Sequence, residues 1–286
     1  MIKRESHTHG PYGVRDGLRQ SLILAWRTLL QLRRNPWELM DFSLQPILFL
    51  VLFLFVFGGA VAGSTSDYLS FMLPGVIVMN LVFVTVYVGH GLNTDLSKGV
   101  FDRFRALPIA RWAPLAGRII ADLVKQSWCI LLLLLVGTLL GFRVSEPLWG
   151  IMMMVVLLLV FALAMSWVMV LVGVLASDPE HVQLFGFTAL FPVTFISNVF
   201  VPAETMPPVL RVIAELNPVS LLTVASRGLL SGGPVLEPTL GVLAWAALIA
   251  LIFAPLSVAA LNRRLAKSEG WRLAAMASRM PRMVAA

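Results

Sequence analysis

The sequence predicts an all-α integral membrane protein with six transmembrane helices, an N-terminal interfacial amphipathic helix and short outer re-entrant helices. Three observations predict this class. Of the 286 residues, 58% are hydrophobic and only 13% are charged, whereas about a quarter are charged in an ordinary soluble domain. Six apolar stretches approach or exceed the length that crosses a bilayer. The Lys and Arg residues are concentrated in alternate connecting segments.

The same composition excludes a disordered chain, a nucleic-acid-binding module and most soluble enzymes. The formal net charge of +7 therefore indicates contact with an anionic membrane face, and no nucleic-acid partner is expected. Cys129 is the single cysteine in the sequence, so neither a disulfide framework nor a multi-cysteine metal site is possible.

Residues 1–41 are expected to form a cytoplasmic N-terminal region with an amphipathic helix between Arg15 and Arg34. Its apolar residues recur at helical spacing, and Asn35-Pro36 ends the pattern. Such a helix is expected to lie in the cytoplasmic interface of the membrane. It acts as a membrane anchor, as a docking surface for a cytoplasmic partner, or as both. The residues expected at this interface are Arg19, Trp26, Arg27, Arg33 and Arg34.

Residues 42–261 are expected to form the transmembrane domain. The first apolar stretch is interpreted as a span and not as a cleaved leader, because more than 40 residues precede it. The fifth is short and is broken by Pro192. The six expected spans are residues 42–63, 68–92, 119–142, 149–176, 184–200 and 239–261.

The distribution of Lys and Arg predicts the orientation of the chain. The N-terminal segment carries seven of these residues, the loop 93–118 five and the C-terminal tail 262–286 six, which makes eighteen. The loops on the other side carry only Arg143, Arg211 and Arg227. Because positive residues concentrate on the cytoplasmic side, both termini are expected in the cytoplasm, and the protein is expected in the cell inner membrane.

The cytoplasmic loop 93–118 alternates in charge and carries aromatic and apolar residues between the charges. This pattern predicts a short helix with an apolar stripe, ended by Pro108. An apolar stripe flanked by charges is typical of a partner surface, although the loop could also fold back onto its own membrane helices. The candidate contact residues are Phe101, Asp102, Arg103, Phe104, Arg105 and Pro108.

The outer segment 201–238 is half apolar and rich in proline. It predicts one helix from Pro207 or Pro208 to Leu216 and a second over residues 218–230. Together with the short fifth span, this segment is interpreted as a re-entrant arrangement that closes the outer side. A substrate path is expected beside it, with Phe195, Asn198 and Phe200 as candidate residues.

Polar residues within the spans are few. Asp122 and Lys125 lie three apart and are expected to pair with each other. Gln45, Asn80 and His90 are interpreted as hydrogen-bonding links between helices. No catalytic constellation and no metal site is predicted. The sequence contains no Gly-Lys dipeptide and hence no Walker A loop for ATP.

Several of these segments together resemble the membrane subunit of a type-2 ABC exporter, in the daunorubicin-resistance group of drug-efflux permeases. The similarity extends from about Arg15 to Lys267. The residues that carry it are KGVFDRFRALP at 98–108, the segment from Phe191 to Pro202 with Met206-Pro207, and Asn217-Pro218. Asp102 stands where many members carry Glu, which keeps the charge and shortens its reach.

The resemblance implies a division of labour. Two permease subunits, identical or related, would form the pathway, and two cytoplasmic ATPase subunits would bind ATP and Mg, leaving this chain without a cofactor of its own. The interfacial helix and the loop around Asp102 would be the contacts with the ATPase. The expected substrates are amphipathic drugs or lipid-like molecules. Alternatives are a polysaccharide or lipid-linked glycan exporter and a non-transporting membrane scaffold.

Overall fold

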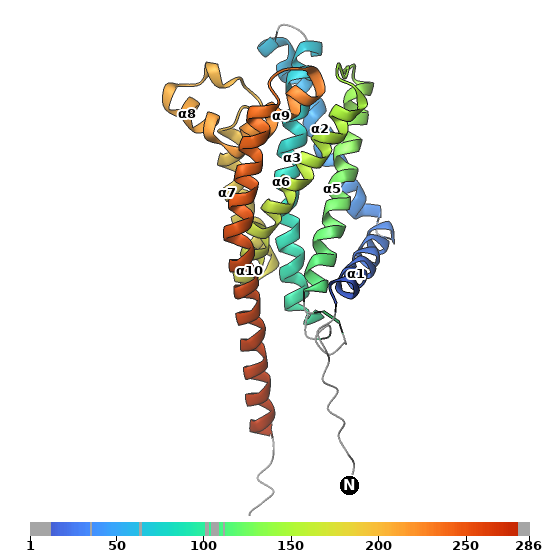
Figure 1. Cartoon of the computed structure of the whole chain (residues 1–286), viewed down its shortest axis with the longest axis vertical. Coiled ribbons are helices and arrows are strands. Elements are labelled where there is room, and N and C mark those ends of the chain that lie inside the picture. Colours follow the sequence, from blue (N-terminus) through green and yellow to red (C-terminus); the bar gives the residue numbers. More distant parts are fainter. Residues whose placement is uncertain are drawn as a thin grey trace, which may run out of the picture.

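The computed structural model describes residues 13–34, 36–62, 65–100, 103, 109–110 and 112–279, and within them the chain folds as an elongated bundle of helices joined by short turns (Figure 1). The elements are α1 (Val14–Arg34), α2 (Pro36–Ala62), α3 (Thr65–Ser97), α5 (Ala113–Leu139), α6 (Leu148–Leu175), α7 (Pro179–Phe195), the 3-10 helix η1 (Ala203–Thr205), α8 (Pro208–Leu216), α9 (Pro218–Ser231) and α10 (Leu236–Arg279).

Four of the described helices, α3, α5, α6 and α10, are long and apolar enough to cross a membrane. They coincide with the second, third, fourth and sixth expected spans, so the all-helical membrane fold is confirmed. Helices α2 and α7 lie at the positions of the first and fifth spans. However, the apolar part described for α2 is Ser43–Val56 and α7 has 17 residues, so the count of six spans stays a prediction.

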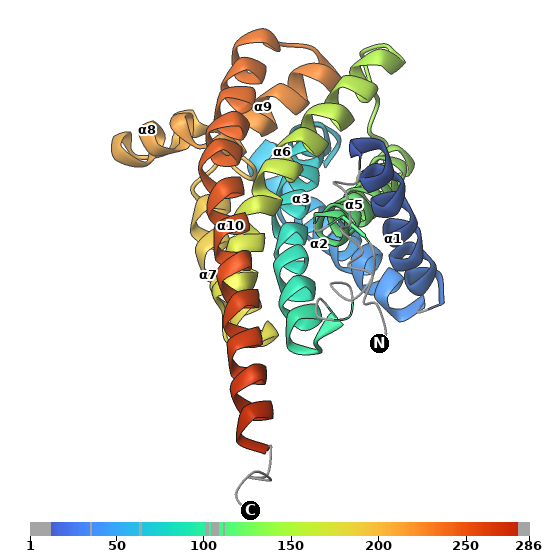
Figure 2. The same cartoon turned by 60° about the horizontal axis from the view of Figure 1, so that its bottom comes forward.

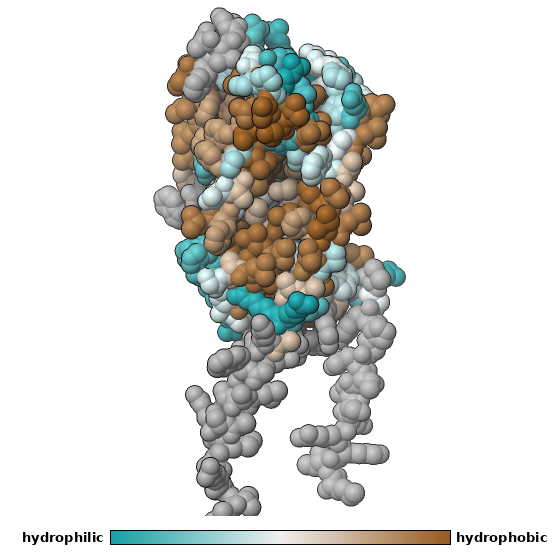
Figure 3. Space-filling view, turned by 90° about the vertical axis from the view of Figure 1, so that its left-hand side faces the viewer, coloured by the Kyte–Doolittle hydropathy of each residue, from teal (hydrophilic) through white to brown (hydrophobic). Residues whose placement is uncertain are grey.

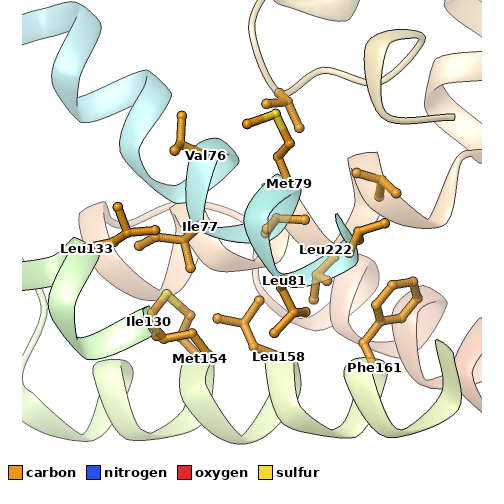
Figure 4. Close-up of a cluster of buried hydrophobic side chains, with 14 of the residues drawn as sticks. Val76, Ile77, Met79, Leu81, Ile130, Leu133, Met154, Leu158, Phe161 and Leu222 are labelled. Carbon is orange, nitrogen blue, oxygen red and sulfur yellow. The ribbon is translucent and has the colours of Figure 1, made fainter. Parts of the chain in front are cut away.

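Helix α3 is the centre of the bundle. It packs against α2, α5, α6, α7 and α9, and 78% of its most apolar window is buried, compared with 22% for α10. Side chains from all around α3 meet in one cluster, in which Ile77 and Leu81 of α3 face α5, α6 and α9 (Figure 4). Because α3 is apolar around its whole circumference, it has to be surrounded by protein.

The outer surface of the bundle carries an apolar belt. Large hydrophobic side chains of α5, α6 and α10 are exposed, among them Leu131, Leu135, Met152 and Leu251. Figure 3 shows hydrophobic residues over the middle of one face and hydrophilic residues toward both ends. Such a belt with polar rims is the surface expected of a protein that is solvated by lipid.

The crossing of α3 with α6 depends on two glycines. A Cβ atom at Gly173 would lie 2.5 Å from the backbone oxygen of Gly89, and a Cβ atom at Gly89 would overlap the backbone oxygen of Met169. Small residues allow two membrane helices to approach at backbone distance. The two helices therefore pack more closely here than larger side chains would permit.

Helix α1 lies inclined against α5, as both ribbon views show (Figures 1 and 2). Its buried residues are the small Gly17, Ser21 and Ala25, and a Cβ atom at Gly117 of α5 would lie 2.7 Å from the Ser21 backbone oxygen. The buried side of α1 is therefore made of small residues. Larger apolar residues of α1 point outward, namely Leu18, Leu22 and Trp26.

Two helical segments extend away from the bundle. The bent pair α8 and α9, with an angle of 70° between the helices, confirms the two short helices predicted for the outer segment, and α8 projects sideways (Figure 2). Helix α10 continues without a break from Leu236 to Arg279. The tail expected from residue 262 is thus helical through Arg279.

We expect Gly89→Val to destabilise the protein by about 1–3 kcal/mol, because the added side chain has to displace the α6 backbone. Thermal unfolding of the purified protein in detergent would measure the loss as a lower melting temperature. Ala247→Val on the exposed side of α10 is the matched control and should melt as the unaltered protein does. Equal melting of the two variants would contradict the close crossing.

Candidate functional site

A cavity with two adjoining compartments opens between α2, α3, α5 and α7. Their volumes are about 260 Å³ and 200 Å³, and each is partly open to the surroundings. The two compartments share part of their lining, so one ligand can reach both. The shared residues are Gln45, Pro46, Asn80, Val84 and Tyr87.

The smaller compartment, called here the aromatic compartment, is lined mainly by rings. Phe83 of α3 lies 5.7 Å from Phe187 and 6.4 Å from Phe191, measured between ring centroids. Phe191 stacks on Phe195 at 4.2 Å, and Phe49 of α2 completes the wall. Aromatic walls of this kind bind flat apolar rings by stacking and by burial of surface.

Helical periodicity places these rings together. Phe187, Phe191 and Phe195 are spaced by four residues along α7, and Phe83 and Tyr87 are spaced by four along α3. Residues four apart share one face of an α-helix. The sequence analysis identified only Phe195 of this group, although the four-residue spacing could have indicated the others.

The larger compartment, called here the polar compartment, is lined by charged residues of α5. The ammonium of Lys125 lies 3.6 Å from Asp122 Oδ1, which confirms the predicted pair, and Arg118 Nε lies 3.9 Å from Asp122 Oδ2. Arg118 also forms an ion pair with Asp95 near the end of α3. Lys125 and Asp122 are 10% and 8% exposed, so these charges interact in a largely desolvated environment.

Gln45, Asn80 and His90, interpreted above as links between helices, also line this cavity. His90 Nδ1 lies 3.1 Å from the backbone oxygen of Pro179 at the start of α7. Because a carbonyl oxygen only accepts hydrogen bonds, Nδ1 carries the proton in this contact. His90 thus joins α3 to α7 at the edge of the polar compartment.

The junction of α6 with α7 is closed by side chains from other helices. Asn93 Nδ2 donates to the backbone oxygens of Gly173 and Ala176, each at 2.9 Å, and Arg264 of α10 donates to Val174 at 2.6 Å. These donors satisfy carbonyl groups that a helix end leaves unpaired, and the positive charge of Arg264 suits a helix C-terminus. The ends of α3 and α6 are therefore held together, and α10 is joined to them at Arg264.

Helix α7 begins with a capped turn. The carboxylate of Asp178 accepts a hydrogen bond from the His181 backbone N–H at 3.0 Å and contacts His181 Nδ1 at 2.6 Å. The backbone hydrogen bond first, and the imidazole contact second, lower the pKa of Asp178 below its ordinary value. The cap is consequently charged at neutral pH and fixes the start of the helix that carries the three phenylalanines.

The predicted interfacial helix contacts the end of the loop 93–118. Gln20 Oε1 accepts a hydrogen bond from the Ala110 backbone N–H at 2.8 Å, and the Trp112 side chain lies against Gly17. Arg19, Trp26 and Arg27 are exposed on α1. Arg33 and Arg34 belong to its last turn, and their side chains lie outside the described residues.

Most of the candidate contact residues in the loop cannot be placed. Arg103 is helical and exposed, with its backbone N–H 3.4 Å from the Gly99 oxygen. The others lie outside the described residues, namely Phe101, Asp102, Phe104, Arg105 and Pro108. The base of the loop is described, and there the Asp95–Arg118 pair joins the end of α3 to the start of α5.

The three residues expected on a substrate path have different positions. Phe195 lines the aromatic compartment. Phe200 lies at its outer end, where its ring stacks on Phe53 of α2 at 4.8 Å and lies 5.3 Å from Phe195. The side chain of Asn198 is not part of the described cavity lining, and its oxygen is buried without a hydrogen-bond partner in the described structure.

Arg227 fixes this outer turn, a role that was not predicted from the sequence, although Arg227 lies within the helix predicted over residues 218–230. Its side chain belongs to α9. It donates to the backbone oxygens of Phe71 at 2.9 Å, Asn198 at 2.8 Å and Val199 at 3.2 Å. Its guanidinium also lies 3.7 Å from the centroid of the Phe71 ring. The Arg227 guanidinium thereby links α9 to α3 and to the turn that follows α7.

Comparison with known proteins assigns a family to this arrangement. The signature of the family described as "ABC-2 type transporter" matches residues 19–230. The chain is 41% identical over 238 residues to a daunorubicin resistance ABC transporter permease protein of Streptomyces coeruleorubidus, which covers 83% of this chain and 84% of the relative. It is 28% identical over 244 residues to a "probable doxorubicin resistance ABC transporter permease protein" of Mycobacterium tuberculosis, covering 84% and 87%.

We expect Arg227→Met to destabilise the protein by about 1.5–3 kcal/mol, the usual value of hydrogen bonds that involve a charged group. Three backbone carbonyl groups would lose the hydrogen bonds that Arg227 donates. Thermal unfolding would detect the loss. Arg211→Met is the matched control, since Arg211 forms only an exposed ion pair with Glu215, and such surface pairs contribute little to stability. Similar melting temperatures for the two variants would contradict the role assigned to Arg227.

Proposed function

The chain belongs to the ABC-2 type transporter family, and we propose that it is the permease subunit of an ATP-driven exporter that moves amphipathic drug-like or lipid-like molecules out of the cytoplasm. The observation that carries this proposal is the divided cavity between α2, α3, α5 and α7, with rings in one compartment and charges in the other. Such a site suits a molecule with an apolar ring and a polar end. The two relatives, which are named as drug-resistance permeases, agree with it.

The proposed topology has six spans with both termini in the cytoplasm. Helices α2 and α7 would supply the two spans that their length and apolarity do not establish by themselves. Supporting this, α2 and α7 both pack on α3, the most buried helix, and the excess of eighteen cationic residues against three lies on the proposed cytoplasmic side. The short α8–α9 pair would close the outer side without crossing the membrane.

The energy would come from separate ATPase subunits. The sequence contains no Walker A motif, so ATP and Mg would be bound by two copies of a cytoplasmic ABC ATPase. A second permease subunit, identical or related, would complete the pathway. The ATPase would contact α1 and the loop 93–118, with Asp102 and its neighbours as the principal contacts.

Contacts at both ends of the loop 93–118 would transmit movement of the loop to the cavity. The Asp95–Arg118 pair closes the base of the loop, and Arg118 also lines the polar compartment. On the other side, the Gln20–Ala110 hydrogen bond joins α1 to the end of the loop. Closure of the ATPases on ATP would therefore shift both elements together and bias the permease between inward-facing and outward-facing states.

A glycan exporter remains the second candidate, because sugar rings also stack on aromatic side chains. The aromatic compartment has a volume of about 200 Å³, and small ligand sites start at about 300 Å³. This size favours one ring system over an extended glycan chain. Transport assays with both substrate classes would separate the two candidates.

Charge reversal at Asp102 should uncouple the transporter. With the permease reconstituted together with its ABC ATPase, Asp102→Lys is expected to abolish most substrate-stimulated ATP hydrolysis while the protein stays in the membrane. Glu237→Lys, at the exposed start of α10, is the control and should behave as the unaltered protein. Normal stimulation in Asp102→Lys would exclude the coupling role, and ATP hydrolysis by the purified permease alone would exclude the subunit assignment.

A reporter fused after Ala286 should be active in the cytoplasm, because of the excess of positive residues in the tail. The same reporter inserted after Phe142, in the turn between α5 and α6, should be active only on the outer side. A reversed pattern would overturn the proposed orientation.

A further inference from the structure

We propose that α8 lies in the plane of the membrane and inserts its outward face among the acyl chains of the outer leaflet, which holds the outer end of α7 in place. This outward face consists of Val209, Val212, Ile213 and Leu216. The partner is a lipid surface, so the inference goes beyond the proposed function and does not depend on the substrate class.

Helix α8 has an apolar face that is not covered within the described structure. Of its nine residues, all described, only Ala214 is buried, and Val209 and Leu216 are 73% and 67% exposed. It packs against α9 and η1 and projects away from the bundle (Figures 1 and 2). Because an isolated helix of this length is marginal in water, a further contact has to stabilise it.

The residues of α8 are divided between an apolar and a charged side. With about 3.6 residues per turn, the four residues of the outward face lie on one side of the helix, and Arg211 and Glu215 lie outside it. Arg211 Nε donates to Glu215 Oε1 at 2.7 Å, so the two charges compensate each other. A helix with one apolar and one polar side is the form that lies in a membrane interface.

Two contacts place the segments on either side of α8 below the outer rim of the bundle. Asn217, directly after α8, donates from Nδ2 to the Val193 oxygen in the last turn of α7 at 2.6 Å. The turn after α7, which leads to α8 through η1, packs on α3, where a Cβ atom at Gly75 would lie 2.7 Å from the Val199 oxygen. Gly75 follows the outer start of α3 at Thr65 by ten residues, about 15 Å along the helix. Both segments therefore lie at the level of the outer leaflet.

Lipid accounts for this surface better than a second copy of the chain. Both ribbon views place α8 on the side of α7 and α10. Gly241 of α10 lies against Leu221 at the start of α9, so the exposed Leu240 and Leu243 continue the apolar belt at the level of α8. Figure 3 looks at this side, and hydrophobic residues reach into its upper part. A stable protein interface takes about 20–30 residues on each side, whereas the outward face of α8 has four.

Insertion of α8 would restrain one end of the aromatic compartment. The hydrogen bond from Asn217 reaches Val193, which lies between Phe191 and Phe195 in the wall of that compartment. On the other side, Arg227 holds the turn from which η1 and α8 continue. A helix that is fixed in the leaflet therefore limits movement of the outer end of α7.

The first test measures where the two sides of α8 lie. In a Cys129→Ser background, single new cysteines carry a bimane label, with Ile213→Cys on the outward face and Glu215→Cys on the charged side. Leu251→Cys in the belt and Glu146→Cys in the turn between α5 and α6 are the lipid-exposed and water-exposed references. The labelled proteins, checked for folding by thermal unfolding, are placed in phosphatidylcholine nanodiscs and quenched by brominated acyl chains or by aqueous iodide.

We expect brominated lipid to quench the Ile213→Cys label at least about threefold more strongly than the Glu215→Cys label, because an interfacial helix buries one side only. Iodide should give the reverse order. Iodide quenching of Ile213→Cys as strong as that of Glu146→Cys would overturn the insertion. Protection of Ile213→Cys from both quenchers, together with energy transfer between two labelled copies, would also overturn it and assign the face to a second copy.

The second test measures the restraint on α7, using Ile213→Asp in otherwise unaltered protein in the same nanodiscs. Hydrogen exchange of the backbone amides of residues 196–201 should become at least about threefold faster. Exchange in the buried middle of α3 should stay unchanged, which shows that the bundle is folded. Glu215→Gln is the matched control and should alter neither segment. Unaltered exchange at residues 196–201 in Ile213→Asp would overturn the restraint on α7.

Discussion

The structure depends on the burial of α3 among the other helices. Because its circumference is apolar, α3 has to be covered by α2, α5, α6, α7 and α9, and glycine pairs such as Gly89 and Gly173 allow the closest of these approaches. The cavity and two of the connections described above then lie against α3. The cavity lies against the middle of α3, and the base of the loop 93–118 lies at one end of this helix. The outer turn held by Arg227 lies near the other end, where Arg227 contacts Phe71.

A second constraint is that lipid offers no hydrogen bonds to the backbone. Two of the breaks between helices are closed by long polar side chains from neighbouring helices. Arg227 donates hydrogen bonds to carbonyl oxygens of the turn after α7. Asn93 and Arg264 donate to carbonyl oxygens at the end of α6. Arg227 and Arg264 are both half-buried and donate to backbone carbonyl groups. The carbonyl groups at the end of α6 carry the partial negative charge of a helix C-terminus. Charged side chains therefore stabilise helix breaks that lie next to the site.

The sequence predicted the fold better than the site. Hydropathy over about 20 residues locates α3, α5, α6 and α10, since each carries its signal within one continuous segment. The cavity has no such signal, because Gln45, Asn80 and Arg118 lie on three different helices and only packing brings them together. The role of Arg227 has no sequence signal for the same reason, because its carbonyl partners are 29 and 156 residues away.

One residue belongs to two parts of the molecule. Arg118 binds Asp95 at the base of the loop 93–118 and also borders the ligand cavity. If a ligand held Arg118 more tightly in one position of the loop, the cavity and the loop would share a coupling free energy, and such coupling is reciprocal. Where substrate and motor subunit favour the same position of the loop, a substrate recognised at Arg118 would raise the affinity of the permease for its motor subunit by the same factor by which the motor raises the affinity for substrate. An empty transporter would on this basis hold its motor less tightly than a loaded one.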